Sequence, residues 1–571
     1  MKPTIIPVLF LTSLILFSCS GENGNKADLI IFNGTIQTLD DNNPLAEAVA
    51  VNGDTIYSVG TNDEILKLKS KTTKIIDLKG KYLTPGFIDS HAHLIGLGKS
   101  KSELDLKNVD NWDEIIFMCA DAAAEKLPGD WILGRGWHQE KWDPVPNPNI
   151  NGYPVHKVLS SAVPNNPVLL VHASGHEVFA NKKAMDIAGI TKETPDPVGG
   201  IIVRDEDGNP TGLFKENAAD IITKAYDKYY SKLPQQERKR ELAGYIESAE
   251  KECISKGITS FHDAGSTFEE INTFKELADS GKLKIRLNVM ILENNPGLRR
   301  KIADYRLIGY GNNFLTVRSI KKYMDGALGS RGAWLLEPYS DMPDSFGLNV
   351  TPVSEIEKTA EIAIENDFQL CVHSIGDRAN RETLDLYERV FKNHPDKKNL
   401  RWRIEHAQHL SGEDIGRFAK LGVIPVMQTV HCTSDAVFVE KRLGHERALE
   451  GAYVWRKLIN SGSAIANGTD APVEDIDPIR NFYAAVTRRT SSGNQFFPGQ
   501  CMTRLEALQS YTVNGAFAAF EENLKGRIKP GMLADFTVFS NNLLKIPESE
   551  LLNTRVIYTI IGGKVVYSAE E

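Results

Sequence analysis

The chain is 571 residues long, with 41% hydrophobic residues, 25% charged residues and a formal net charge of −9. This is globular composition with enough apolar material for a large core, and the length exceeds that of one typical domain. Because no basic stripe runs through the sequence, we expect no nucleic-acid partner.

The first residues have the pattern of an export signal. Met1-Lys2 is followed by an apolar stretch over residues 5–17, which is too short to span a bilayer. Residues 16–19, Leu-Phe-Ser-Cys, are similar to a bacterial lipoprotein cleavage box. We therefore expect a signal peptide over residues 1–19, lipidation of Cys19 and a short tether over residues 20–26. The protein would then reside in the bacterial periplasm or cell envelope, touching the membrane only through its lipid. An ordinary signal peptide with an incidental cysteine is the alternative.

Both ends of the remaining chain contain short β-rich runs. Residues 27–84 and 525–571 alternate such runs with turn signals, including Asn33-Gly34 and Asn52-Gly53. Each end is too small to form a sandwich alone. We therefore predict one composite β-sandwich domain built from both ends of the chain.

Between these ends, residues 85–524 alternate short apolar strands with longer helical patterns, which is typical of a parallel sheet. Eight strands are predicted, the number that closes a TIM-like (β/α)8 barrel. They lie at residues 86–89, 258–261, 285–289, 319–323, 369–373, 401–406, 423–427 and 464–467. A segment rich in proline and tryptophan, about residues 99–211, is too long for a simple crossover. We interpret it as an inserted, lid-like subdomain.

Potential metal ligands follow several of these strands. His91 and His93 follow the first strand and point to the same side, because side chains alternate along a strand. The fifth and sixth strands end at His373 and His406, and Asp470 follows the eighth. The carboxyl ends of barrel strands meet on one face, and four imidazoles with one carboxylate suit a metal such as zinc. A packed core role is the alternative for a single histidine, such as His262 after the second strand.

Four segments resemble the amidohydrolase superfamily, and in particular its amidohydrolase 3 family. Residues 83–93, LTPGFIDSHAH, are similar to the first-strand signature, and residues 323–333, YMDGALGSRGA, to a motif of that family. Residues 175–190 and 526–535 resemble two further stretches. The similarity runs from about residue 27 to residue 566, and N-substituted formamide deformylases are the characterised members to compare first.

The resemblance implies a pair of divalent metal ions, with zinc the expected metal, bridged by a lysine that carbon dioxide has carboxylated. Alignment on the 323–333 motif makes this lysine Lys321, with Lys322 as the alternative. The resemblance assigns His91 and His93 to one metal and His373 and His406 to the other. Asp470 binds or adjoins the first metal and acts as general base and then general acid.

Two further residues are candidates for substrate binding. The resemblance places His176 near the substrate carbonyl, although a structural histidine of the insertion is an equal alternative. Arg331 would face an anionic substrate group, or else form a salt bridge that fixes its loop.

We therefore expect a metal-dependent hydrolase of a non-peptide, amide-type carbon–nitrogen bond in a small molecule, in which water activated by the metals attacks. An esterase or lactonase on the same barrel and a non-catalytic binding lipoprotein are the alternatives. The sequence also leaves open a homo-oligomer.

Overall fold

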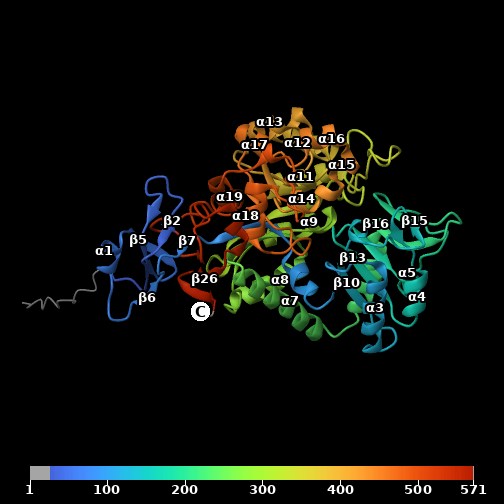
Figure 1. Ribbon diagram of the computed structural model, residues 1–571, viewed down its shortest axis with the longest axis horizontal. Helices are drawn as coiled ribbons and strands as arrows, with labels where there is room; N and C mark the ends of the chain where they lie inside the picture. The colour runs from blue at the N-terminus through green and yellow to red at the C-terminus, as the bar shows by residue number, and fades with distance from the viewer. Residues whose placement is uncertain (1–25, 570–571) are drawn as a thin grey trace, which may run out of the picture.

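The computed structural model describes residues 26–569, and a parallel β-barrel lies at its centre (Figure 1). Each barrel strand is hydrogen-bonded in parallel to the next one in chain order. The eight strands are β8 (Phe87–Ala92), β17 (Ile258–Ser266), β18 (Arg286–Ile291), β20 (Leu315–Tyr323), β21 (Gln369–Ser374), β22 (Arg403–His406), β23 (Ile424–Met427) and β24 (Ala466–Asn467). The predicted α/β barrel is confirmed.

The ends of the barrel sheet meet through the backbone beyond β24. The amide N–H of Asp470 donates to the carbonyl of His91 at 2.7 Å, and that of His93 to Ala471 at 2.8 Å. The last strand is thereby tied to the first, which brings the residues after β8 beside those after β24.

Helices on the outside explain why the barrel strands are apolar runs. Every residue of β18, β21 and β23 is buried, as expected for a parallel sheet with helices on its outer face. The helices place apolar stripes against the strands; Leu384 and Tyr387 are examples on α12. Five of these helices are α7 (Gln235–Ser255), α8 (Phe268–Asp279), α11 (Val353–Glu365), α12 (Asp377–Asn393) and α13 (Gly412–Leu421).

Strands from both chain ends form one sheet beside the barrel (Figure 1). Its order is β27 (Lys564–Ser568), β26 (Val556–Ile561), β25 (Phe536–Phe539), β7 (Tyr82–Pro85), β2 (Thr35–Gln37) and β3 (Leu45–Ala46). A second sheet comprises β5 (Thr55–Gly60), β4 (Ala48–Asn52), β1 (Leu29–Phe32) and β6 (Lys74–Asp77). The two sheets share one apolar core, in which Val49 and Ile31 pack with Leu83 and Phe536.

The segment between β8 and β17 folds around its own sheet, coloured teal on the other side of the barrel in Figure 1. That sheet has the order β15 (Gly200–Arg204), β16 (Pro210–Glu216), β14 (Glu177–Ala180), β13 (Val168–His172), β10 (Ile132–Trp137) and β9 (Leu104–Asp105). Trp112, Trp137 and Trp142 pack together on one face and Trp131 on the other. The tryptophans of the insertion therefore build its core.

Cys19 lies outside the described residues. Within residues 26–569, no helix has both the length and the apolar character that crossing a bilayer requires.

Candidate active site

The predicted ligands of strands one and eight come together at the carboxyl end of the barrel. Asp470 Oδ1 lies 3.2 Å from His93 Nε2 and 3.5 Å from His91 Nε2. His91 is the fifth residue of β8, and His93 immediately precedes helix α2 (Leu94–Ser100). These three side chains form one group whose ligand atoms are close enough to share a metal ion.

The backbone around Asp470 is specialised for this close approach. A Cβ at Gly468 would lie 2.4 Å from the amide nitrogen of His91, so only glycine fits there. Thr469 donates its hydroxyl to the buried Asp89 carboxylate at 2.6 Å, and burial raises the pKa of Asp89 to about 7. Asp470 itself has a left-handed backbone (φ 58°), as does His406 (φ 73°). Such conformations cost free energy in non-glycine residues and concentrate at functional sites.

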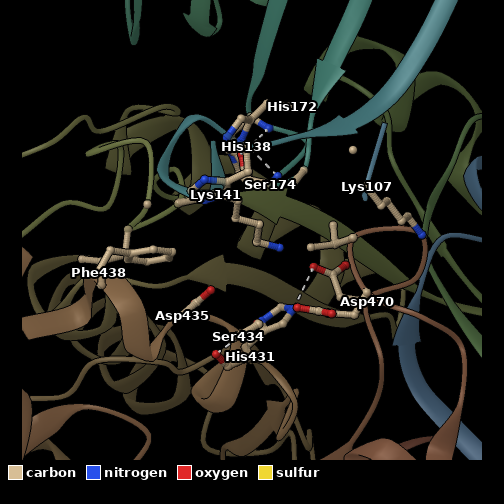
Figure 2. Close-up of a pocket in the computed structure, with 18 of the residues that line it drawn as sticks. Lys107, His138, Lys141, His172, Ser174, His431, Ser434, Asp435, Phe438 and Asp470 are labelled. Atoms are coloured by element: carbon tan, nitrogen blue, oxygen red, sulfur yellow. Dashed lines mark hydrogen bonds and ion pairs between the residues drawn. The ribbon is translucent and has the colours of Figure 1, made fainter. Parts of the chain in front are cut away.

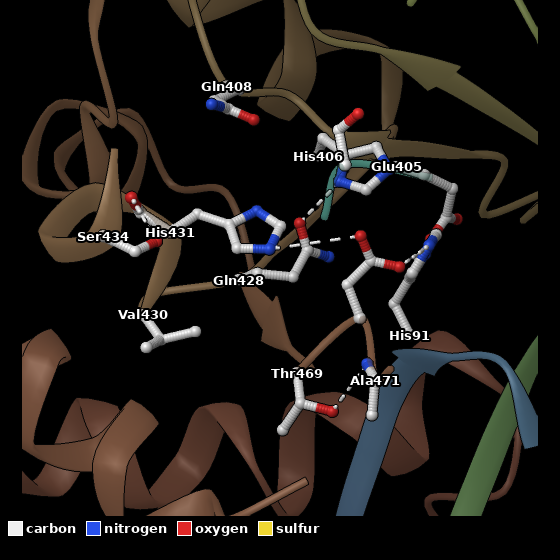
Figure 3. A network of polar contacts seen from close by, with 12 residues as sticks. His91, Glu405, His406, Gln408, Gln428, Val430, His431, Ser434, Thr469 and Ala471 are labelled. Atoms are coloured by element: carbon white, nitrogen blue, oxygen red, sulfur yellow. Dashed lines mark hydrogen bonds and ion pairs between the residues drawn. The ribbon is translucent and has the colours of Figure 1, made fainter. Parts of the chain in front are cut away.

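A buried ion pair fixes the orientation of His91. Its Nδ1 contacts Glu405 Oε2 (Figure 3). Arg403 donates to both oxygens of Glu405, at 2.7 and 2.8 Å. Burial alone would raise the pKa of Glu405, but Arg403 and His91 hold it well below its usual range. Because Nδ1 is occupied in this way, Nε2 of His91 is left to face Asp470.

His406 is oriented similarly and has a neighbour that the sequence analysis missed. Its Nδ1 lies 2.7 Å from Gln428 Oε1, which frees Nε2 for a ligand (Figure 3). His431, in the short helix α14 (His431–Ser434), has Nε2 4.0 Å from Asp470 Oδ2. His406, His431 and Asp470 form a second group that could hold a metal ion. His431 stands four residues after the seventh strand, and this position at the carboxyl end of a barrel strand could have indicated a ligand. We expected no ligand there.

Strand β20 separates the two candidate lysines. Lys321 is fully buried and lines a cavity with His93, His373 and Asp470. Lys322 instead donates to the carbonyl of Glu293 at 2.6 Å, and burial lowers its pKa to about 8. Only Lys321 therefore faces the predicted metal ligands.

The buried polar atoms of this site fit a metal centre. Nε2 of His91, His373 and His431 and Oδ1 of Asp470 are buried and have no hydrogen-bond partner. Leaving such atoms unsatisfied is costly, and nitrogen and carboxylate donors are what zinc and similar divalent ions bind. The donor set is therefore suited to a cation at the centre of the group.

The site opens into two cavities, which share His176, His373, His406 and Asp470 among their lining residues. The first cavity, about 550 Å³, has His431 and Asp470 on one side and His138 and His172 of the insertion opposite them (Figure 2). The second cavity, about 530 Å³, lies between the insertion and barrel residues that include His93 and Lys321. The insertion therefore forms part of both walls.

His176 faces the site from the insertion. Its Nδ1 lies 2.8 Å from Glu216 Oε2, and its ring centroid is 5.0 Å from that of His373. Burial lowers the pKa of His176, but the Glu216 carboxylate outweighs burial and raises it. The structure thus brings His176 to the metal-ligand group.

Two other predicted candidates lie elsewhere. Arg331 forms a two-point ion pair with Asp341, at 2.8 and 3.3 Å, and lines neither cavity. His262 is buried beneath the site, with Nδ1 3.3 Å from Arg403, and belongs to neither metal-ligand group. The salt-bridge alternative for Arg331 and the core alternative for His262 match these positions.

Comparison with known proteins supplies the family. The model of the amidohydrolase family matches residues 74–567. Protein LONG AFTER FAR-RED 3 of Arabidopsis thaliana is 33% identical over 97% of this chain and 94% of its own length. Putative amidohydrolase YtcJ of Bacillus subtilis is 32% identical over 94% of this chain and 98% of its own length. N-substituted formamide deformylase of Arthrobacter pascens is 27% identical over 95% of this chain and 98% of its own length.

Solved structures agree with this assignment. A metal-dependent hydrolase from Pyrococcus horikoshii has a TM-score of 0.72 and 27% identity, over 91% of this chain and 99% of that one. A metal-dependent hydrolase from Pyrococcus furiosus has a TM-score of 0.70 and 28% identity, over 90% of this chain and 100% of that one. The extent of the family match, together with the converging histidines and aspartate, shows that the chain belongs to the amidohydrolase family and is a metal-dependent hydrolase.

Proposed function

We propose that the protein hydrolyses a non-peptide, amide-type carbon–nitrogen bond of a small molecule at a pair of divalent metal ions, with zinc the expected metal. The observation that carries the proposal is the group of buried histidine and aspartate ligand atoms that converge at the carboxyl end of the barrel. His91 and His93 would hold one ion and His373 and His406 the other, with Asp470 beside the first. His431 groups with His406 and Asp470 and would be a further ligand on that side of the site.

Lys321 is proposed to bridge the two ions in its carboxylated form. A lysine amine that has reacted with carbon dioxide becomes an anion with two oxygen donors, which suits two cations held close together. The support is its complete burial beside His93, His373 and Asp470. Lys322, which donates to a backbone carbonyl, does not face these residues.

When bound, such ions polarise a substrate carbonyl and make water acidic enough to lose a proton near neutral pH. Asp470 would accept that proton and return it to the leaving nitrogen, and its position beside His91 and His93 supports this role. His176 has Nδ1 committed to Glu216, so its Nε2 is left to donate to the carbonyl oxygen of the substrate.

Export and lipid anchoring at Cys19 form part of the same proposal and rest on the first 19 residues of the sequence. Incorporation of a radiolabelled fatty acid by the full chain, and its loss in Cys19→Ala, tests the anchor. Equal labelling of both proteins would rule out lipidation at this residue.

A substrate panel tests the reaction class. Matched amides, esters and lactones with the same acyl group are offered to protein carrying its metals and to protein treated with a chelator. The proposal predicts metal-dependent release of amines. Turnover of esters or lactones alone would favour the esterase alternative. Binding without turnover of any compound would favour the binding-protein alternative.

A further inference from the structure

The second cavity contains an arginine that no predicted role accounts for. Arg135 lies in β10, whose backbone pairs with Val171 of β13 and Asp105 of β9. Its side chain lines the cavity together with His93, His176 and Asp470. The guanidinium Nη2 lies 3.3 Å from the position that a Cβ would take at Gly175, next to His176. The arginine is therefore part of the wall that faces the metal-ligand group.

The side chain of Arg135 is half-buried, and its guanidinium forms no hydrogen bond or ion pair with the residues that the structure describes. Its Nε atom is buried and without a hydrogen-bond partner, and no carboxylate of residues 26–569 forms an ion pair with it. Burial lowers the pKa of Arg135, and the negative charges of Asp470 and Glu103 oppose this shift. A guanidinium nevertheless stays protonated in proteins, so the cavity holds a positive charge that is not in an ion pair with any described side chain.

The carboxylates around this charge are already occupied. Glu103, which reaches Arg135 electrostatically, is paired with Lys99 at 3.4 Å. Asp470 belongs to the metal-ligand group. The other carboxylates of the cavity also have partners: Glu216 contacts His176, Asp220 contacts Lys224, Asp263 accepts from Ser266, and Glu270 accepts from Thr267. None of these carboxylates forms an ion pair with Arg135, so an anion brought by a ligand could supply the partner that the guanidinium lacks.

We propose that Arg135 binds a carboxylate of the substrate, so that the enzyme acts on amides of the N-acyl amino acid class. This inference rests on the proposed hydrolysis of a carbon–nitrogen bond. In such a compound the carboxylate is a few bonds from the scissile amide, which matches a cavity lined by both Arg135 and Asp470. A guanidinium binds a carboxylate through two parallel hydrogen bonds, which also orients the amide towards the metal site.

The fold supports this role because the arginine stands on a rigid element. β10 lies inside the sheet of the insertion, between β9 and β13. Trp137 of the same strand is fully buried and donates to the carbonyl of Leu170 at 3.0 Å. The backbone that carries Arg135 is therefore fixed, as a residue that selects substrates requires.

The test compares N-acyl amino acids with the matching N-acyl amino alcohols, in which a neutral hydroxymethyl group replaces the carboxylate. We expect the wild-type enzyme to favour the acid in kcat/KM by about 10- to 100-fold, the range for a charged hydrogen-bonded contact. Arg135→Gln should remove this preference, because it lowers kcat/KM for the acid more than kcat/KM for the alcohol. Arg135→Lys should restore part of it, because charge returns without the two-point geometry.

Two variants control the result. Arg204→Gln changes an arginine of the same sheet that is paired with Asp196, and should keep the preference for the acid. Arg331→Gln tests the site expected from the sequence. If Arg331→Gln abolishes the preference and Arg135→Gln keeps it, the proposal is overturned. It is also overturned if the phosphonate analogue of the substrate is preferred to the carboxylate.

A binding measurement separates this proposal from the proposed reaction. Calorimetric titration of metal-free protein with an N-acyl amino acid should show binding that Arg135→Gln weakens about 10-fold or more. Such binding without turnover by the metal-loaded enzyme would sink the proposed reaction but keep the anion site. Turnover of amides with no dependence on Arg135 in either assay would sink the anion site alone.

Discussion

Asp470 is proposed both to adjoin a metal ion and to carry a proton, and its surroundings support this proposal. It contacts His91 and His93 through one oxygen and approaches His431 with the other. Asp89 holds the preceding Thr469, and the backbone of Asp470 adopts a left-handed conformation. A residue fixed in this way can serve both as metal neighbour and as proton carrier.

The Asp470→Asn variant tests the proton-transfer role. Asparagine keeps the shape and one oxygen donor but does not accept a proton, so kcat should fall about 10²- to 10⁴-fold. Metal content, measured in parallel, should stay near that of the wild type. Unchanged kcat with full metal content would contradict the role.

Glu405 acts through His91. In Glu405→Gln the charge that orients His91 is lost, and the affinity for metal should fall about 10- to 100-fold. Competition with a chromogenic chelator measures this affinity. Glu250→Gln is the matched control, because Glu250 is a buried carboxylate that accepts from backbone amides of Lys284 and Ile285, away from the site. Equal affinities in the two variants would contradict the orienting role.

At the scale of the element, the alternation of side chains along β20 determines which of the two neighbouring lysines, Lys321 or Lys322, faces the metal-ligand group. Successive side chains of β20 point to opposite sides, so Lys321 faces the barrel interior and Lys322 faces outward to Glu293. The sequence shows that the two lysines must point to opposite sides but not which one faces the barrel interior, because two identical residues stand next to each other in the strand. The packing of β20 between β18 and β21 sets this orientation.

Lys321→Ala should therefore lose at least one metal ion per chain, whereas Lys322→Ala should retain the wild-type content. Elemental analysis of both variants, purified side by side, checks this prediction. Full metal content in Lys321→Ala would remove the lysine bridge from the mechanism.

The strands of the barrel could be predicted from the sequence for a physical reason. There is also a physical reason why some site residues could not be predicted. Strands buried on both faces are continuous apolar runs, and ligands at their ends, such as His373 and His406, follow from barrel geometry. His431 and Arg135 lie on a loop helix and on the inserted sheet. Their positions depend on how those segments pack over the barrel, which no local pattern reveals.

At the scale of the whole molecule, a buried ion pair connects the composite β domain to the barrel. Arg286 of β18 contacts both oxygens of Asp535, next to β25, at 2.6 and 3.0 Å. Both side chains are almost completely buried. Residues far apart in the sequence thus hold the two units together.

Asp535→Ala should lower the free energy of unfolding by about 3–5 kcal/mol, because it leaves Arg286 buried without its partner. Glu276→Ala, which breaks the exposed pair with Lys239, should cost only about 0–1 kcal/mol. Denaturant unfolding of both variants gives these values. A similar small loss in both would show that the buried pair does not stabilise the fold.

Elemental analysis of the wild-type chain tests the proposed metal centre most directly. The protein is expressed without its first 19 residues, purified without chelator, and analysed for divalent metals per chain. We predict two ions, one held by His91 and His93 and the other by His373 and His406. One ion per chain would contradict the bridged pair, and none after incubation with zinc and bicarbonate would contradict the metal centre itself.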